Sequence, residues 1–149
     1  MAIAFFSTWT TYGTWLPGDE RGWFHSGIGL QLSDRIRQYE SALMMREDAI
    51  VLDPEQRIIV ERTVAEHCAI RKWNLHAVHC RTNHVHAVVT APGSGIAILR
   101  EQFKAWCTRK LKEQSDSGRK NWWTERGWDE YIDDDAALAE VIEYVRDRQ

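Results

Sequence analysis

The pattern of apolar and polar positions predicts four regions of β-strand. Residues 2–12 are rich in β-branched and aromatic side chains, which favour a strand, and the glycines and prolines that follow predict a long loop. Residues 75–80 and 84–89 predict two strands joined by a short turn, and therefore a hairpin. Short strands around Gly127 are expected within residues 122–132.

Four other segments have apolar residues at helical spacing. The first covers residues 33–48. The second begins at Asp53, which can cap the first turn, with Pro54 in the first helical position and Gln56 at the capping-box spacing, and it should end near residue 73. Residues 96–112 form the third and most basic segment, and the acidic residues 133–135 precede a last helix that runs to the end of the chain.

The order of these elements is strand, loop, two helices, two strands, helix, short strands and helix. It predicts an α+β fold with helices packed on a ferredoxin-like antiparallel sheet. A chain of 149 residues with 44% hydrophobic content suits one domain over residues 1–149. We expect a cytoplasmic protein with reduced thiols and no membrane segment, because apolar runs are short, secretory signals are lacking and the three cysteines show no CxxC spacing.

Two histidines mark the strand predicted at residues 84–89. Side chains two residues apart share a face of a strand, so His84 and His86 lie together while Val85, Ala87 and Val89 face a core. Two imidazoles on one face form half of a metal site. A structural zinc site that also uses Cys80 is an alternative, although Cys80 precedes the turn and no fourth ligand is obvious.

The last helix carries a tyrosine at the edge of its apolar stripe. The stripe contains Leu138, Val141, Ile142 and Val145, and Gln149 falls near its middle. Tyr144 could be an ordinary boundary residue, or a nucleophile whose weakly reactive phenol is helped by a nearby cation. Tyr131 is a competing nucleophile, but it lies in a strand-like stretch before the helix.

The basic helix offers possible contacts to nucleic acid, despite the net charge of -3. Its cations could line a DNA backbone, and Trp106 or the loop tryptophans could stack on bases. A solvated helix face is the alternative. The candidate cations are Lys104, Arg109, Lys110 and Lys112.

Taken together, these motifs resemble the single-tyrosine HUH transposases, and most closely their REP-associated tyrosine transposase-like branch. The resemblance rests on residues 82–89 (TNHVHAVV) and on Glu143-Tyr144-Val145 in the last helix. The early run TWTTYGTWLPGDERGW and residues 123–128 (WTERGW) also look like that branch, so the resemblance covers nearly the whole chain.

The resemblance implies a nuclease domain that cuts and rejoins single-stranded DNA at hairpin-associated sites through a 5′-phosphotyrosine, with Mg²⁺ or Mn²⁺. It makes Tyr144 the nucleophile and His84 and His86 metal ligands. The third ligand of such proteins is commonly a glutamine or asparagine one turn after the tyrosine, whereas this chain has arginine there and glutamine one position later. Gln149 is therefore the first choice for that ligand and Asp147 the second.

The resemblance also implies a homodimer, and it leaves open whether the tyrosine acts in cis or in trans. A different class of function stays possible. The acidic net charge and the displaced glutamine would also suit a domesticated protein that binds structured single-stranded DNA without cutting it.

Overall fold

A four-stranded antiparallel sheet forms the centre of the molecule. The computed structural model describes residues 2–14, 23–25 and 29–147. The strand order is β4-β5-β1-β6, and the predicted hairpin of β4 and β5 is confirmed. The strands are β1 (Ala4–Thr10), β4 (Asn74–Cys80), β5 (His84–Thr90) and β6 (Trp128–Ile132).

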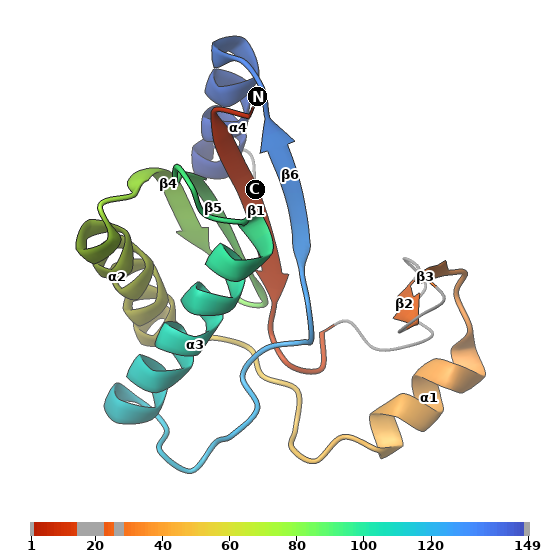
Figure 1. Ribbon diagram of the computed structural model, residues 1–149. Coiled ribbons are helices and arrows are strands. Elements are labelled where there is room, and N and C mark those ends of the chain that lie inside the picture. The colour runs from red at the N-terminus through yellow and green to blue at the C-terminus, as the bar shows by residue number, and fades with distance from the viewer. Residues whose placement is uncertain (1, 15–22, 26–28, 148–149) are drawn as a thin grey trace.

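Helices cover both faces of this sheet. Helices α2 (Pro54–Arg71) and α3 (Ile96–Gln114) pack side by side on one face, and α4 (Asp135–Asp147) packs on the other (Figure 1). We call the face covered by α2 and α3 the core face, and the face covered by α4 the α4 face. With β1 and β5 in the middle of the sheet and antiparallel to each other, this is the predicted ferredoxin-like α+β arrangement.

The region between β1 and α2 differs in part from the predicted loop. It contains a short hairpin of β2 (Trp23–His25) and β3 (Gly29–Gln31), followed by α1 (Arg35–Leu43). Strands of three residues are too short to show a recognisable alternation in the sequence. Helix α1 extends away from the sheet and has no buried residue (Figure 1). Residues 15–22, which carry part of the family resemblance, lie outside the described residues.

The boundaries of α2 show how local sequence sets the elements. The Asp53 carboxylate accepts a hydrogen bond from the backbone N–H of Gln56 at 2.7 Å, and the Gln56 side chain accepts one from the backbone N–H of Asp53 at 2.9 Å. The predicted capping box is therefore confirmed. Lys72 adopts a left-handed conformation with φ of 61° and ends the helix close to the expected position.

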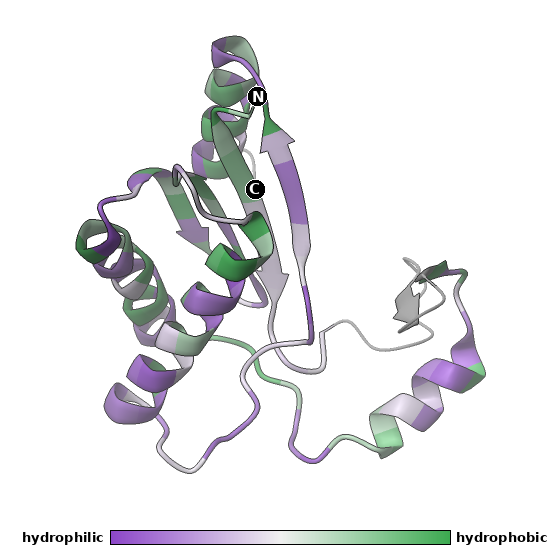
Figure 2. Ribbon diagram, in the orientation of Figure 1, coloured by the Kyte–Doolittle hydropathy of each residue, from purple (hydrophilic) through white to green (hydrophobic). Residues whose placement is uncertain are grey.

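The two faces bury separate apolar clusters. On the core face, Trp9 of β1 stacks on Phe103 of α3 with ring centroids 5.8 Å apart, and both are fully buried. On the α4 face, a smaller cluster joins Val88, Ile132 and Val145. Hydrophobic residues concentrate in these layers, whereas the edge strand β6 is mostly hydrophilic (Figure 2). Within the described ranges, no helix is long and apolar enough to cross a membrane.

Candidate functional site

Alternation along β5 places its two histidines on the α4 face. Val85, Ala87 and Val89 belong to the cluster of the core face, as predicted. His84 and His86 point the other way, and their ring centroids lie 4.8 Å apart. His86 is only 8% exposed and its ring also contacts that of Phe6. The strand therefore presents two neighbouring imidazoles beside α4.

Each histidine is oriented through its Nδ1 atom. Thr8 Oγ1 on β1 lies 2.7 Å from His86 Nδ1, and Asn83 Oδ1 lies 2.8 Å from His84 Nδ1. These hydrogen bonds fix the rings. Metal-ligating histidines are commonly held in this way, with one ring nitrogen in a hydrogen bond and the other as the ligand atom.

The environment of His86 favours its neutral form. Burial is the main cause, and the nearby His84, His79 and Arg81 add to it, so that the pKa of His86 falls from 6.5 to about 4. A neutral imidazole has the lone pair that a metal ion needs. At neutral pH this side chain is therefore ready to act as a ligand.

A third histidine, which the sequence analysis missed, lies on the same face. His79 of β4 is the cross-strand partner of His86, and its Nδ1 atom is buried and has no hydrogen-bond partner among the described residues. In a hairpin with its turn at residues 81–83, residue 80 pairs with residue 85 and residue 79 with residue 86. This register could have predicted the position of His79 from the sequence.

The described residues supply two well-oriented candidate ligands rather than a complete metal shell. Within the described part of the chain, no three His, Cys, Asp or Glu side chains form a group able to hold a metal ion. Asp147, the second choice for the third ligand, is exposed at the end of α4. Gln149, the first choice, lies outside the described residues.

Tyr144 lies beside the histidines. The predicted apolar stripe of α4 packs on the sheet, with Val145 fully buried and Leu138, Val141 and Ile142 partly buried. Tyr144 sits at the edge of this stripe and is 44% exposed, and its ring centroid lies 5.9 Å from that of His86 and 6.4 Å from that of Phe6. A partly exposed phenol and two imidazoles thus meet at one place on the α4 face.

The competing candidates point away from this place. Tyr131 of β6 is 63% exposed and its ring meets the edge of Phe5, a residue packed against the cluster of the core face. Cys80 is also buried in that cluster, which separates it from His84 and argues against a zinc site that uses both. Of these two tyrosines, Tyr144 is the one that lies next to the histidines.

The basic residues of α3 lie on the opposite side of the sheet. Lys104 is buried, and its ammonium donates to the backbone carbonyls of Thr124 at 2.9 Å and Arg126 at 3.1 Å. This location corrects the sequence interpretation, because a buried lysine bonded to carbonyls supports the fold and does not offer a DNA contact. DNA contacts by Arg109, Lys110 and Lys112 stay predictions.

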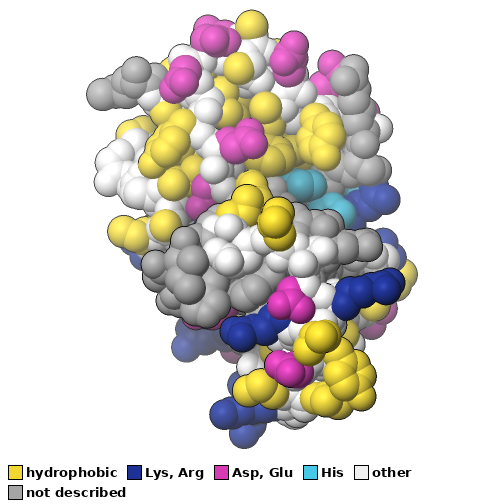
Figure 3. All heavy atoms as spheres, turned by 90° about the vertical axis from the view of Figure 1, so that its right-hand side faces the viewer, with side chains coloured by type: hydrophobic (Ala, Val, Ile, Leu, Met, Phe, Trp, Pro, Cys, Tyr) yellow, Lys and Arg dark blue, Asp and Glu magenta, His cyan; other side chains and the backbone are white. Residues whose placement is uncertain are grey.

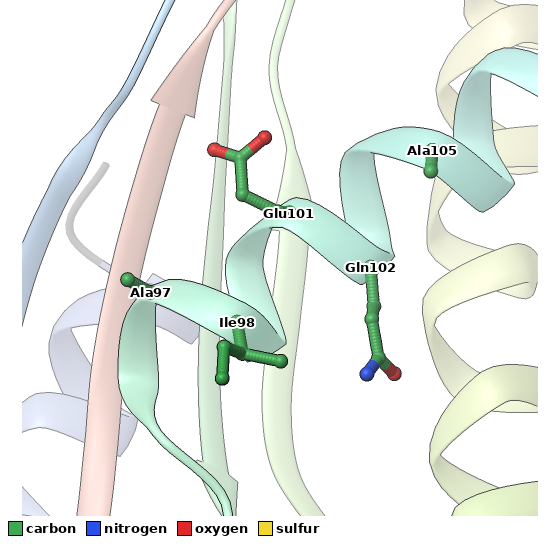
Figure 4. A pocket seen from close by; sticks show the side chains of 5 residues that line it. All are labelled: Ala97, Ile98, Glu101, Gln102 and Ala105. Atoms are coloured by element: carbon green, nitrogen blue, oxygen red, sulfur yellow. The ribbon is translucent and has the colours of Figure 1, made fainter.

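The surface differs between the two sides. An open, apolar hollow of about 420 Å³ lies on α3 and is lined by Ala97, Ile98, Glu101, Gln102 and Ala105 (Figure 4). Since α3 covers the core face, this hollow is not part of the site formed by the histidines and Tyr144.

In the space-filling view, histidine side chains reach the surface next to hydrophobic and basic side chains (Figure 3).

Solved structures share this fold. A REP-associated tyrosine transposase bound to a REP hairpin superposes with a TM-score of 0.58 at 15% identity over 97% of this chain, and the chain spans 66% of that protein's length. A candidate transposase from Deinococcus radiodurans R1 gives a TM-score of 0.59 at 12% identity, over 100% of this chain and 92% of the other. At these identities the likeness shows the fold alone.

The sequence itself matches a family. Comparison with functionally curated proteins finds no match. The family described as IS200-like transposases matches residues 33–147, a range that includes the histidine strand and the whole of α4. The predicted resemblance is confirmed, and the chain belongs to the IS200-like transposase family.

Proposed function

We propose that this chain is a metal-dependent endonuclease and strand transferase that acts on single-stranded DNA. The observation that carries the proposal is the meeting of a helix-borne tyrosine with two oriented histidines. The Tyr144 ring lies 5.9 Å from that of His86, which lies 4.8 Å from that of His84. Membership of a transposase family supports this reading of the site.

The donor set suits a divalent cation. His84 and His86 would hold Mg²⁺ or Mn²⁺ through their Nε2 atoms, since hydrogen bonds occupy both Nδ1 atoms. A bound cation would polarise the scissile phosphodiester and stabilise the charge that develops on it. Gln149 and Asp147 are the proposed sources of a further ligand, in that order.

Tyr144 would perform the covalent step. Its phenol oxygen attacks the phosphorus and loses its proton, the bond from phosphorus to the 3′-oxygen breaks, and that oxygen leaves and gains a proton. The products are a 5′-phosphotyrosine and a free 3′-hydroxyl. Attack of a 3′-hydroxyl on the phosphotyrosine reverses these changes, releases Tyr144 and joins two DNA ends without any other source of energy.

The arrangement favours action in cis, because Tyr144 and His86 of the same chain are in ring contact. A homodimer stays a prediction from the family resemblance. For the substrate we propose DNA with a hairpin, since the REP-associated relative is bound to one. Recognition of particular bases by this chain would depend on contacts with residues outside the site of Tyr144 and the histidines.

A cleavage assay with a matched control tests the nucleophile. A labelled hairpin oligonucleotide with single-stranded flanks is incubated with Mn²⁺, and covalent adducts are separated on a denaturing gel. Tyr144→Phe should abolish the adduct, whereas Tyr131→Phe, a change to an exposed tyrosine on the other face, should leave it unchanged. An adduct of parental strength with Tyr144→Phe would contradict the assignment.

The same experiment separates the proposed enzyme from a protein that only binds DNA. If the parent chain forms no adduct with Mg²⁺ or Mn²⁺ but still retains the labelled hairpin in a binding assay, the non-enzymatic alternative holds. That alternative is favoured by one observation, the incomplete ligand set among the described residues.

A further inference from the structure

One exposed tryptophan shares a cross-strand row with the proposed site. Thr8 of β1 pairs with His86 on one side and with Trp128 of β6 on the other. Directly paired residues of an antiparallel sheet point to the same face, so Trp128 lies on the α4 face, two strands from His86. Two strand spacings amount to ~10 Å, which a flexible single strand covers within a few nucleotides.

Trp128 is also partly exposed to solvent. The residue is 44% exposed, although a side chain as large as that of tryptophan is usually mostly buried. Helix α4 packs mainly over β4 and β5, and Trp128 lies at the opposite end of β6 from the buried Ile132. A large exposed aromatic ring beside a proposed phosphodiester site is a suitable surface for an unpaired base.

The backbone that carries Trp128 is held firmly by buried polar groups. Before it, the Lys104 ammonium binds the carbonyls of Thr124 and Arg126. After it, Asp129 pairs with Arg100 and accepts a hydrogen bond of 2.8 Å from Ser7. Burying such charges is favourable only when their partners stay in place, so this segment has little freedom to move.

Gly127 holds the same segment against β1. A side chain at this position would bring a Cβ to 2.4 Å from the carbonyl oxygen of Thr8. Alternation along β6 turns Asp129 towards α3 and Trp128 towards the α4 face. The buried contacts on the core face thereby fix the backbone that carries Trp128, which lowers the entropy lost when a base stacks on its side chain.

We propose that Trp128 is a stacking platform for an unpaired base of the single-stranded DNA, next to the phosphodiester at Tyr144 and the histidines. The inference rests on the proposed function, since it assumes that single-stranded DNA reaches the α4 face. Stacking on an aromatic ring is tolerant of base identity and contributes to binding without a charge on the stacking residue.

Binding measurements on a chain that cannot cut DNA test the inference. In a Tyr144→Phe background, fluorescence anisotropy gives the Kd for an oligothymidine of about 20 nucleotides and for an abasic strand with the same number of phosphates. Adding Trp128→Leu should weaken binding of the oligothymidine roughly tenfold, the scale expected for the loss of one stacked base. On the abasic strand the same change should have no effect.

Two further variants control for fold and for position. Trp128→Phe keeps an aromatic ring and should retain most of the affinity. Tyr131→Leu alters another exposed aromatic residue of β6, 63% exposed, which lies on the core face against Phe5, and should leave the Kd within about twofold. Thermal unfolding of each variant verifies that the chain is folded.

The outcomes separate this inference from the proposed chemistry. Equal weakening of both strands by Trp128→Leu, or no weakening of either, overturns the stacking role even if the parent forms the Tyr144 adduct. If the base-dependent loss is found but the parent forms no adduct, the stacking role stands and the proposed nuclease activity fails.

Discussion

The two faces of the sheet use alternate residues of the same strands for different purposes. On the core face, Trp9 and Phe103 are fully buried, and charged groups such as Asp129 and Lys104 bind partners within the chain. On the α4 face, the cluster is smaller and borders on imidazoles and a partly exposed phenol. Stability and proposed chemistry are thus separated by a single residue step along β1 and β5.

Because of this separation, substitutions on the two faces should affect different properties of the protein. Changes on the core face should lower the free energy of unfolding, while changes around the histidines should alter metal or DNA binding in a chain that still folds. A core-face substitution that altered metal or DNA binding in a folded chain would show that the faces are coupled.

The largest expected effect is on the core face. Phe103→Ala removes a fully buried ring that contacts Trp9, Trp73 and His67, and should lower the free energy of unfolding by about 4 kcal/mol. Tyr144→Phe removes only a hydroxyl from a partly exposed residue and should change that free energy by less than about 0.5 kcal/mol. Urea unfolding measures both. Similar losses for the two variants would break the comparison.

An intermediate effect is expected from pH. The pKa of His86 is about 4 in the folded chain, mainly because of burial and then because of His84, His79 and Arg81, against 6.5 when unperturbed. Between these values the unfolded chain binds more protons, so acid favours unfolding. Stability should fall as the pH drops from 6.5 to 4, by up to about 3 kcal/mol from this group, and should not depend on it above pH 6.5.

The pH effect can be isolated with one variant. Urea unfolding is measured with a chelator present at several pH values between 4 and 7, for the parent and for His86→Gln. The variant should show the shallower dependence on pH. Parallel curves for the two chains would mean that His86 is not held neutral by the fold.

The smallest expected effect concerns the hydrogen bond that orients His86. Thr8→Val removes the hydroxyl that lies 2.7 Å from Nδ1, and should weaken Mn²⁺ binding roughly tenfold in calorimetry, as loss of an orienting partner does at other metal sites. Thr10→Val is the control on the same strand and face, because its hydroxyl pairs with Thr124. If Thr10→Val weakens binding as much, the effect is not specific to His86.

Local patterns in the sequence were enough for the fold and for half of the site. The capping residues at Asp53 fixed where α2 begins, and the alternation from His84 to Val89 assigned each side chain of β5 to its face. Both follow from interactions within a few residues. The apolar stripe of α4 likewise predicted that Tyr144 would lie at its edge.

Features that depend on contacts between distant elements could not be read in this way. In the sequence, Lys104 cannot be told from the exposed lysines of a basic helix. Its burial depends on the carbonyls of Thr124 and Arg126, which come from a distant segment. The positions of His79 and Trp128 depend on strand register, and the contact of Tyr144 with His86 depends on how α4 packs. Spacing along the chain does not determine these distances.

The central position of β1 has a consequence for the order in which this protein folds during synthesis. Thr8 and His86 are 78 residues apart, and Ser7 and Asp129 are 122 apart, so β1 leaves the ribosome well before the strands that pair with it. Pairings between such distant residues form slowly, and an unpaired aromatic strand is prone to aggregation in the meantime. We therefore expect the local β4–β5 hairpin to form first, with the nascent AFFSTWT segment unprotected until β5 and then β6 enclose it.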